Sequence, residues 1–263
     1  MVTAESVYAE SARYNAAVLC LPGLWSTPAV WRPFAGYLGH RGWESQLLDV
    51  REAPGGMQDR VAAVAPHVAE VAGRAVVIGH DAGALLANAV AARARPAAVV
   101  MIAPLVPGTR AVRRATLSVR SVVALLAGRR IAPPTGGAAA EWIDVPEPAR
   151  TATRAMLADD EAAFVRDVVW GRVAPTAIPG VPALVVAGGD DGLLDRRSAE
   201  AFAEATGAEL RVVDGAGHWL LAGPRWQDVA ALVHRWLVQR LGGSLLEFYA
   251  EAMADRDADE ESS

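Results

Sequence analysis

Short apolar runs and longer amphipathic stretches alternate along most of the chain, and this alternation predicts an α/β fold with a mostly parallel sheet. The apolar runs predict strands that begin near Ala16, Trp43, Ala75, Ala97, Pro182 and Glu209. In the stretches between them, apolar residues recur every three or four positions, which predicts helices at 28–39, 56–73, 82–94, 196–205 and 224–241. Residues 6–14 are predicted to form one further strand at an edge of the sheet.

One junction between a strand and a helix has an unusual composition. The β-branched run Val76-Val77-Ile78 predicts a strand buried on both faces, and Gly79-His80-Asp81-Ala82-Gly83 follows it directly. Small residues on either side of Asp81 allow strand and helix backbones to approach closely, because a Cβ atom would collide there. This G-x-D-x-G pattern is typical of a nucleophile elbow, a strained turn that projects one side chain above the sheet. The usual serine is replaced by aspartate.

Three other stretches occur in the order that accompanies such an elbow. They are the strand and loop Ala17–Leu24, the strand Pro182–Asp191 with its G-x-x-D turn, and the strand Leu210–Trp219 with its Gly-His pair. Together with the elbow, they resemble the α/β-hydrolase superfamily from about Val7 to Leu241. The resemblance implies an α/β-hydrolase fold, with a mostly parallel central sheet that is flanked by helices.

The same resemblance implies a catalytic site. Asp81 takes the position of the nucleophile, Asp191 that of the acid and His218 that of the base. The backbone N–H groups of Leu24 and Ala82 correspond to the oxyanion hole. His80 is expected to pack in the core, because its side chain should point away from the apex of the elbow.

Between Leu105 and about Ile178 the alternation of strands and helices stops, and helical patterns appear at 113–126, 148–157 and 159–170. A loop is predicted at 129–137. Since the superfamily inserts its cap at this place, we predict a core of residues 1–104 and 179–243 and a helical cap of residues 105–178. Residues 244–263 form a carboxyl-terminal extension, with an amphipathic helix at 244–253 and an acidic end that is expected to be disordered.

Composition narrows the choice of partners. The chain has 263 residues, of which 52% are hydrophobic, enough for one α/β domain with an insertion. Six acids and one arginine after residue 250 account for the net charge of −5, so the body is neutral and no nucleic-acid partner is expected. Cys20 is the only cysteine. No signal-peptide pattern or bilayer-length apolar run is present, so a cytoplasmic protein without a membrane partner is expected.

An aspartate at the elbow changes the expected chemistry. Its carboxylate would form an unfavourable mixed anhydride with an ester, but it can displace a leaving group at saturated carbon and form an alkyl ester that water hydrolyses. This is the chemistry of haloalkane dehalogenases and epoxide hydrolases, which also carry aspartate there. The chain departs from them at Leu24 and Ala82, where dehalogenases have halide-holding side chains, and its predicted cap lacks the tyrosines of epoxide hydrolases.

These departures favour a different reaction at the sequence level: proton transfer with elimination, such as loss of a carboxylate from a polyketide-type intermediate. This reaction is similar to those of hydroxynitrile lyases and of the acetate-eliminating enzymes of tetronate pathways, which have this fold. Asp81 and His218 would remove a proton next to a carbonyl, and the N–H groups of Leu24 and Ala82 would stabilise the enolate. Hydrolysis through an alkyl–Asp81 ester is the alternative, and a ligand-binding protein without turnover is the second alternative.

The expected ligand is a small to medium apolar organic molecule. Trp25, Trp170 and Trp219 are predicted to line its pocket, and Trp142 is a further source of an indole N–H donor. No metal-ligand cluster, phosphate loop or dinucleotide fingerprint occurs, so no cofactor and no metal are predicted. The sequence leaves the substrate and the oligomeric state open.

Overall fold

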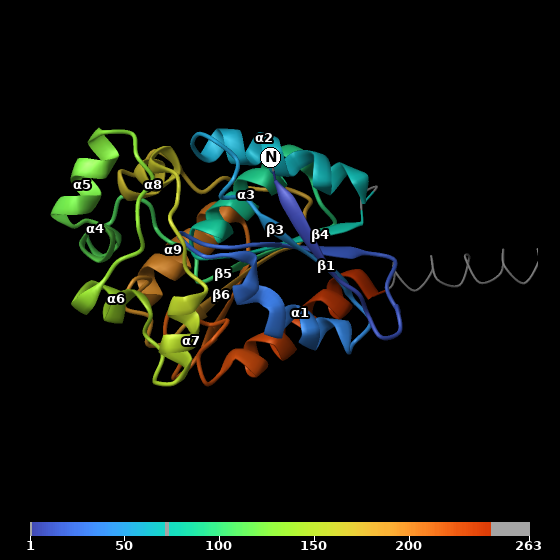
Figure 1. Ribbon diagram of the computed structural model, residues 1–263. Helices are drawn as coiled ribbons and strands as arrows, with labels where there is room; N and C mark the ends of the chain where they lie inside the picture. Colours follow the sequence, from blue (N-terminus) through green and yellow to red (C-terminus); the bar gives the residue numbers. More distant parts are fainter. Residues whose placement is uncertain (1, 72–73, 243–263) are drawn as a thin grey trace, which may run out of the picture.

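A seven-stranded sheet forms the centre of the protein, as shown by a computed structural model that describes residues 2–71 and 74–242 (Figure 1). The strand order is β1-β3-β2-β4-β5-β6-β7, and every neighbouring pair is parallel except β1 with β3. The strands are β1 (Thr3–Val7), β2 (Ala17–Leu21), β3 (Glu44–Asp49), β4 (Ala75–His80), β5 (Ala98–Ile102), β6 (Ala183–Gly188) and β7 (Glu209–Val213). The predicted mostly parallel sheet is confirmed.

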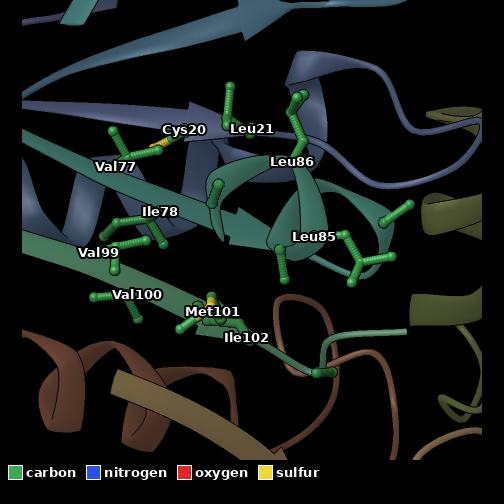
Figure 2. Close-up of a cluster of buried hydrophobic side chains, with 14 of the residues drawn as sticks. Cys20, Leu21, Val77, Ile78, Leu85, Leu86, Val99, Val100, Met101 and Ile102 are labelled. Carbon is green, nitrogen blue, oxygen red and sulfur yellow. The ribbon is translucent and has the colours of Figure 1, made fainter. Parts of the chain in front are cut away.

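The central strands are buried along their whole length. Every residue of β4, β5 and β6 is buried, which is the pattern of a parallel sheet covered on both faces. Figure 2 shows Val77 and Ile78 of β4 beside Val99 and Val100 of β5 in this core. The sole cysteine, Cys20, lies in the same cluster, and burial raises the pKa of its thiol.

Helices cover both faces of the sheet, as predicted. Figure 1 shows α2 (Met57–Glu70) and α3 (Ala82–Ala94) above the sheet, with α1 (Arg32–Gly39) and the helix of residues 226–242 on the other side. A short 3₁₀ turn, η1 (Pro28–Trp31), precedes α1, and α9 (Arg196–Thr206) packs against β6 and β7. No helix in the described ranges is long and apolar enough to cross a membrane.

The edge strand lies earlier than the sequence pattern suggested. The prediction was 6–14, but β1 pairs with β3 from Thr3, opposite Asp49, to Val7, opposite Ser45. Because β3 begins at Glu44, there is no partner backbone for a strand that continues past residue 8. Tyr14 instead stacks on the Trp43 ring, with a distance of 4.1 Å between ring centroids. Residues 8–14 therefore form a loop that packs at Tyr14 but leaves Tyr8 75% exposed, and not a strand.

A helical insertion joins β5 to β6, and Figure 1 shows its helices gathered at one end of the sheet. They are α4 (Arg110–Thr116), α5 (Val119–Leu126), α6 (Gly136–Trp142), α7 (Ala149–Ala155) and α8 (Ala162–Val169). The single helix predicted at 113–126 is wrong: it is interrupted at Leu117-Ser118, where the Ser118 hydroxyl accepts from the N–H of Ser121 and begins α5. Helix α6 was missed, because its glycine- and alanine-rich start has no apolar period. The extension predicted at 244–263 lies outside the described residues.

Candidate active site

The aspartate of the elbow lies at the apex of a sharp turn between β4 and α3. Asp81 has a φ of 60° and a ψ of −127°, a conformation that non-glycine residues rarely adopt and that commonly stores strain at functional sites. A Cβ atom at Gly79 would collide with the Gly83 carbonyl, and one at Gly83 would collide with the Leu21 carbonyl. The two glycines therefore allow the close approach that presents the Asp81 side chain above the sheet.

Asp81, His218 and Asp191 meet at the carboxyl ends of β4, β6 and β7. The Nε2 atom of His218 lies 3.2 Å from Asp81 Oδ2, and Nδ1 lies 2.9 Å from Asp191 Oδ2. The other oxygen of Asp191 accepts hydrogen bonds from the backbone N–H groups of Leu193 and Leu194, at 2.8 and 2.9 Å. All three predicted catalytic side chains are buried. The imidazole is thus held between two carboxylates.

The donors of the predicted oxyanion hole are already occupied by the protein itself. Asp81 Oδ1 accepts a hydrogen bond from the N–H of Leu24 at 3.1 Å and a second one from the N–H of Ala82. Gly23 makes this possible, because a Cβ atom at that position would lie 2.5 Å from Asp81 Cβ. The expectation that Leu24 and Ala82 bind a substrate enolate does not match this arrangement. An aspartate carries a second oxygen that a serine lacks, and that oxygen fills the hole.

The charges in the site shift the pKa values of His218 and Asp191. Burial alone would lower the pKa of His218, but the carboxylates of Asp191 and Asp81 outweigh it and raise that pKa well above its usual value. Burial raises the pKa of Asp191, but the nearby imidazolium and the two backbone N–H donors outweigh this and lower it. The raised pKa of His218 favours an imidazolium between the side chains of Asp81 and Asp191.

His80 contributes a contact that the sequence did not predict. The side chain is fully buried, as expected, and its Nε2 atom lies 3.1 Å from the backbone carbonyl oxygen of His218. Burial, reinforced by the charge on His218, lowers the pKa of His80 to about 4. The neutral ring donates its Nε2 proton to that carbonyl in the matching tautomer. A histidine at the end of a strand that is buried on both faces was the only signal for this role.

The predicted tryptophans behave differently from one another. Trp25 is fully buried; its indole donates to the Ile131 carbonyl at 2.9 Å, and its ring meets Trp142 edge-on at 5.0 Å. The Trp142 ring lies 6.0 Å from the His218 ring, and Trp219 is buried beside His80. Trp170 is 38% exposed, so the structure gives no support to its predicted place in the pocket. Trp142, which the sequence considered only as a donor, is closer to the site.

The insertion is attached to the loop that carries Leu24. Asp160, between α7 and α8, accepts from the N–H of Trp25 at 3.0 Å and forms a fully buried ion pair with Arg60 of α2. The Arg60 guanidinium also lies 3.7 Å from the centroid of the Phe164 ring, which supplies a cation–π contact. Neither Arg60 nor Asp160 was singled out from the sequence, because their contact spans 100 positions.

A cavity of about 540 Å³ lies within the insertion itself, between α5 and the loop that precedes α6. Arg120, Arg129 and Arg130 are among its lining residues, and the catalytic residues and Trp25 are not. This cavity is therefore not the predicted apolar pocket above Asp81. No group of three or more side chains suited to a metal ion occurs in the part of the chain that the structure describes.

Comparison with known proteins places the chain in a family. Residues 18–232 match the model of the "Alpha/beta hydrolase family", so the chain belongs to that family. No curated protein sequence matches the chain. Among solved structures, a monoacylglycerol lipase of Paleococcus ferrophilus superposes with a TM-score of 0.72 at 14% identity, over 91% of this chain and 99% of the other.

Other similar structures carry varied names. A thermophilic esterase of Thermogutta terrifontis has a TM-score of 0.68 at 18% identity, over 91% of this chain and 93% of the other. MenH of S. aureus has a TM-score of 0.68 at 10% identity, over 90% of this chain and 98% of the other. At these identities the likeness concerns the fold, and the predicted α/β-hydrolase fold is confirmed. The reaction must be argued from the site.

Proposed function

We propose that the protein is a hydrolase that cleaves a bond at saturated carbon through an alkyl ester on Asp81. The observation that carries this proposal is the placement of the two Asp81 oxygens: Oδ1 lies in the oxyanion hole and Oδ2 beside His218. A substrate oxyanion has no place in a hole that is already filled. The same hole is, however, well placed to stabilise charge that develops on Asp81 itself.

The first step joins Asp81 to the substrate. Oδ2 attacks the carbon, the bond from carbon to the leaving group breaks, and the leaving group departs with the electron pair. The His218 imidazolium supplies the proton when the leaving group is an alkoxide. An alkoxide leaves as a hydroxyl group with the His218 proton, whereas a halide leaves as the anion and His218 then loses its proton to solvent. In either case the step ends with a neutral alkyl–Asp81 ester and a neutral imidazole.

The second step uses the change of charge that the first step produces. Esterification removes one of the two negative charges that hold the proton on His218, so the pKa of the imidazole falls and His218 can act as a base. His218 then takes a proton from water, which attacks the Asp81 carbonyl carbon. The resulting oxyanion is Oδ1, and it lies within reach of the N–H groups of Leu24 and Ala82. Collapse breaks the bond to the alkyl oxygen, which leaves as the alcohol with the proton from His218. The proton that remains on the Asp81 carboxyl group then passes to His218, which restores the carboxylate and the imidazolium.

Two indoles supply donors for the leaving group. The N–H groups of Trp142 and Trp219 are buried and have no hydrogen-bond partner among the described residues. Unsatisfied buried donors are uncommon, and substrate atoms are natural partners for them. They would replace the side chains that Leu24 and Ala82 do not provide. Together with the buried Trp25, these mainly apolar rings support a small to medium apolar substrate beneath the insertion as a cap.

Elimination is the second candidate. Oδ2 of Asp81 lies 3.2 Å from Nε2 of His218, so the carboxylate could take a proton from carbon while the imidazolium protonates a departing carboxylate. This route yields an unsaturated product and leaves Asp81 unmodified. It ranks second because the enolate would have to find donors other than those that Asp81 occupies.

The test uses 1-bromohexane and styrene oxide as probes. With 1-bromohexane, whose bromide leaves without a proton, the first step remains possible in the His218→Ala variant and the second is blocked, so intact-protein mass should show one alkyl group, and peptide mapping should place it on Asp81. With the unaltered protein in H₂¹⁸O, repeated turnover should carry ¹⁸O into Asp81.

Two controls sharpen the test. Asp81→Asn should remove both signals, and Asp190→Asn, which alters the exposed neighbour of Asp191, should change neither. An unsaturated product without label would support elimination. Absence of turnover and of any adduct with both probes would contradict the displacement proposal.

A further inference from the structure

An aspartate of the insertion holds the backbone of the catalytic histidine. Asp144, in the loop between α6 and α7, accepts the N–H of His218 with Oδ2 and the N–H of Trp219 with Oδ1, the latter at 3.0 Å. These two amides belong to the loop after β7 and lie 74 and 75 positions away in the sequence. One carboxylate from the insertion thus satisfies two successive donors of a catalytic loop.

The loop after β7 has a glycine at the position where a side chain would collide with this carboxylate. Gly217, the residue before His218, has no room for a side chain, because a Cβ atom there would collide with Asp144 Oδ2. The loop also contains Gly215 at a φ of 71°, so its own backbone imposes little stiffness. External contacts must therefore supply the rigidity that a catalytic imidazole requires.

Those contacts reach His218 from several sides. Asp144 holds its N–H, while the buried His80 ring and the N–H of Leu220 reach its carbonyl oxygen at 3.1 and 2.9 Å. The side chain then meets Asp191 on one ring nitrogen and Asp81 on the other. Among these anchors, Asp144 is the one that comes from the insertion.

We propose that Asp144 is a positioning residue: its carboxylate fixes the His218 backbone so that the imidazole bridges Asp81 and Asp191. The insertion is then part of the catalytic machinery and not only a cover over it. The inference rests on the proposed function in one respect, that His218 transfers protons. The part of the proposal that concerns the position of the His218 ring can be tested without any substrate.

The chain offers a matched control in Asp167 of α8. Its Oδ2 atom accepts from the N–H of Met57 at 3.0 Å, so it also joins the insertion to a backbone amide of the core. The neighbouring Gly56 has the same constraint as Gly217, since a Cβ atom there would collide with Asp167. This second contact lies at the start of α2 and has no part in the catalytic site.

The experiment compares Asp144→Asn with Asp167→Asn and Gly217→Ala with Gly56→Ala. The readout is the titration of His218 by NMR of ¹⁵N-histidine-labelled protein, with its signal assigned through His218→Gln. The charged and titratable groups that contact His218 are Asp81, Asp191, His80 and Asp144, and all except Asp144 stay unchanged.

We expect Asp144→Asn and Gly217→Ala to lower the pKa of His218 by about one unit or more, because a loosened ring loses part of its contact with both carboxylates. Alkylation of Asp81 by the active probe should slow by roughly 10- to 100-fold. Asp167→Asn and Gly56→Ala should leave the titration of His218 unchanged, even where they lower the melting temperature equally.

A folding defect can be separated from the positioning effect. Asp144→Glu, which keeps the charge, should recover part of the shift in the pKa of His218. Gly217→Ala should be less harmful in an Asp144→Ala background than alone, because the added methyl group then has space. An unchanged His218 titration in folded Asp144→Asn protein, or an equal shift in Asp167→Asn, would overturn the proposal. If no probe reacts at all, the titration still decides it.

Discussion

The sheet and the insertion share one apolar core, but the insertion adds directional polar contacts to it. In the sheet, every side chain of β4, β5 and β6 is buried, and backbone pairing runs continuously from strand to strand. In the insertion, α5 leaves Val123 61% and Leu126 81% exposed. The insertion also contributes Val112, Trp142 and Phe164 to the buried apolar cluster of the sheet. It adds polar contacts of Asp144, Asp160 and Asp167 with core backbone amides.

This difference has a functional meaning. Apolar burial is non-directional, so it stabilises the sheet without specifying any single geometry closely. Hydrogen bonds that carboxylates accept are directional, and two of the three acidic residues bind backbone N–H groups in the loops that carry Trp25 and His218. Changes in the insertion should therefore affect catalysis more than their effect on stability suggests, and changes in the sheet should do the opposite.

The largest effect is expected for the buried ion pair. Asp160→Ala leaves Arg60 charged and buried without its partner, so the free energy of unfolding should fall by about 3–5 kcal/mol. The double variant Arg60→Met with Asp160→Leu should recover much of that stability in urea unfolding. It should not recover the rate of Asp81 alkylation, because the N–H of Trp25 still lacks its acceptor. If the double variant recovered both the stability and the rate of Asp81 alkylation, the proposed difference between the sheet and the insertion would be contradicted.

A smaller loss of stability is expected in the sheet. Leu19 of β2 is fully buried, and Leu19→Ala should lower the free energy of unfolding by about 2–4 kcal/mol through the lost burial and the cavity it leaves. Since the hydrogen bonds of the catalytic loops are untouched, the alkylation rate of the folded protein should stay within about twofold of the original. A rate loss as large as that of Asp160→Ala would contradict the comparison.

The pH dependence of stability should reflect the central imidazolium. The pKa of His218 is raised in the folded protein, so its contribution is complete below the unfolded value of about 6.5 and is lost as pH rises through the folded value. The pKa of Asp191 is lowered, so its contribution is present above about 3.9 and is lost as pH falls through the folded value. Urea unfolding should show a maximum between these limits, with an alkaline decline that His218→Gln flattens.

The smallest effect is expected on the surface of the insertion. Leu126→Ser replaces an exposed side chain, so the free energy of unfolding should change by less than about 0.5 kcal/mol and alkylation should be unaffected. A marked change in either quantity, measured by urea unfolding and by intact mass, would show that α5 makes a contact in solution that this structure does not contain.

Local patterns in the sequence predicted what depends on neighbouring residues. The β-branched run before Gly79 specified a buried strand, and the small residues around Asp81 specified the turn, because both depend on backbone sterics within a few positions. The position at which the edge strand pairs could not be predicted from neighbouring residues. It depends on where β3 offers a partner, and β3 lies some 40 positions away.

The sequence by itself determined the sheet, the order of the catalytic residues and the residue types that meet at its carboxyl edge. Only the tertiary structure decided that the Asp81 carboxylate fills its own oxyanion hole, and that Asp144 and Asp160 hold the loops of His218 and Trp25. The physical reason is the range of the interactions. Strand and turn preferences act over a few residues, whereas these hydrogen bonds join groups 57, 74 and 135 positions apart, and their geometry exists only once the chain has folded.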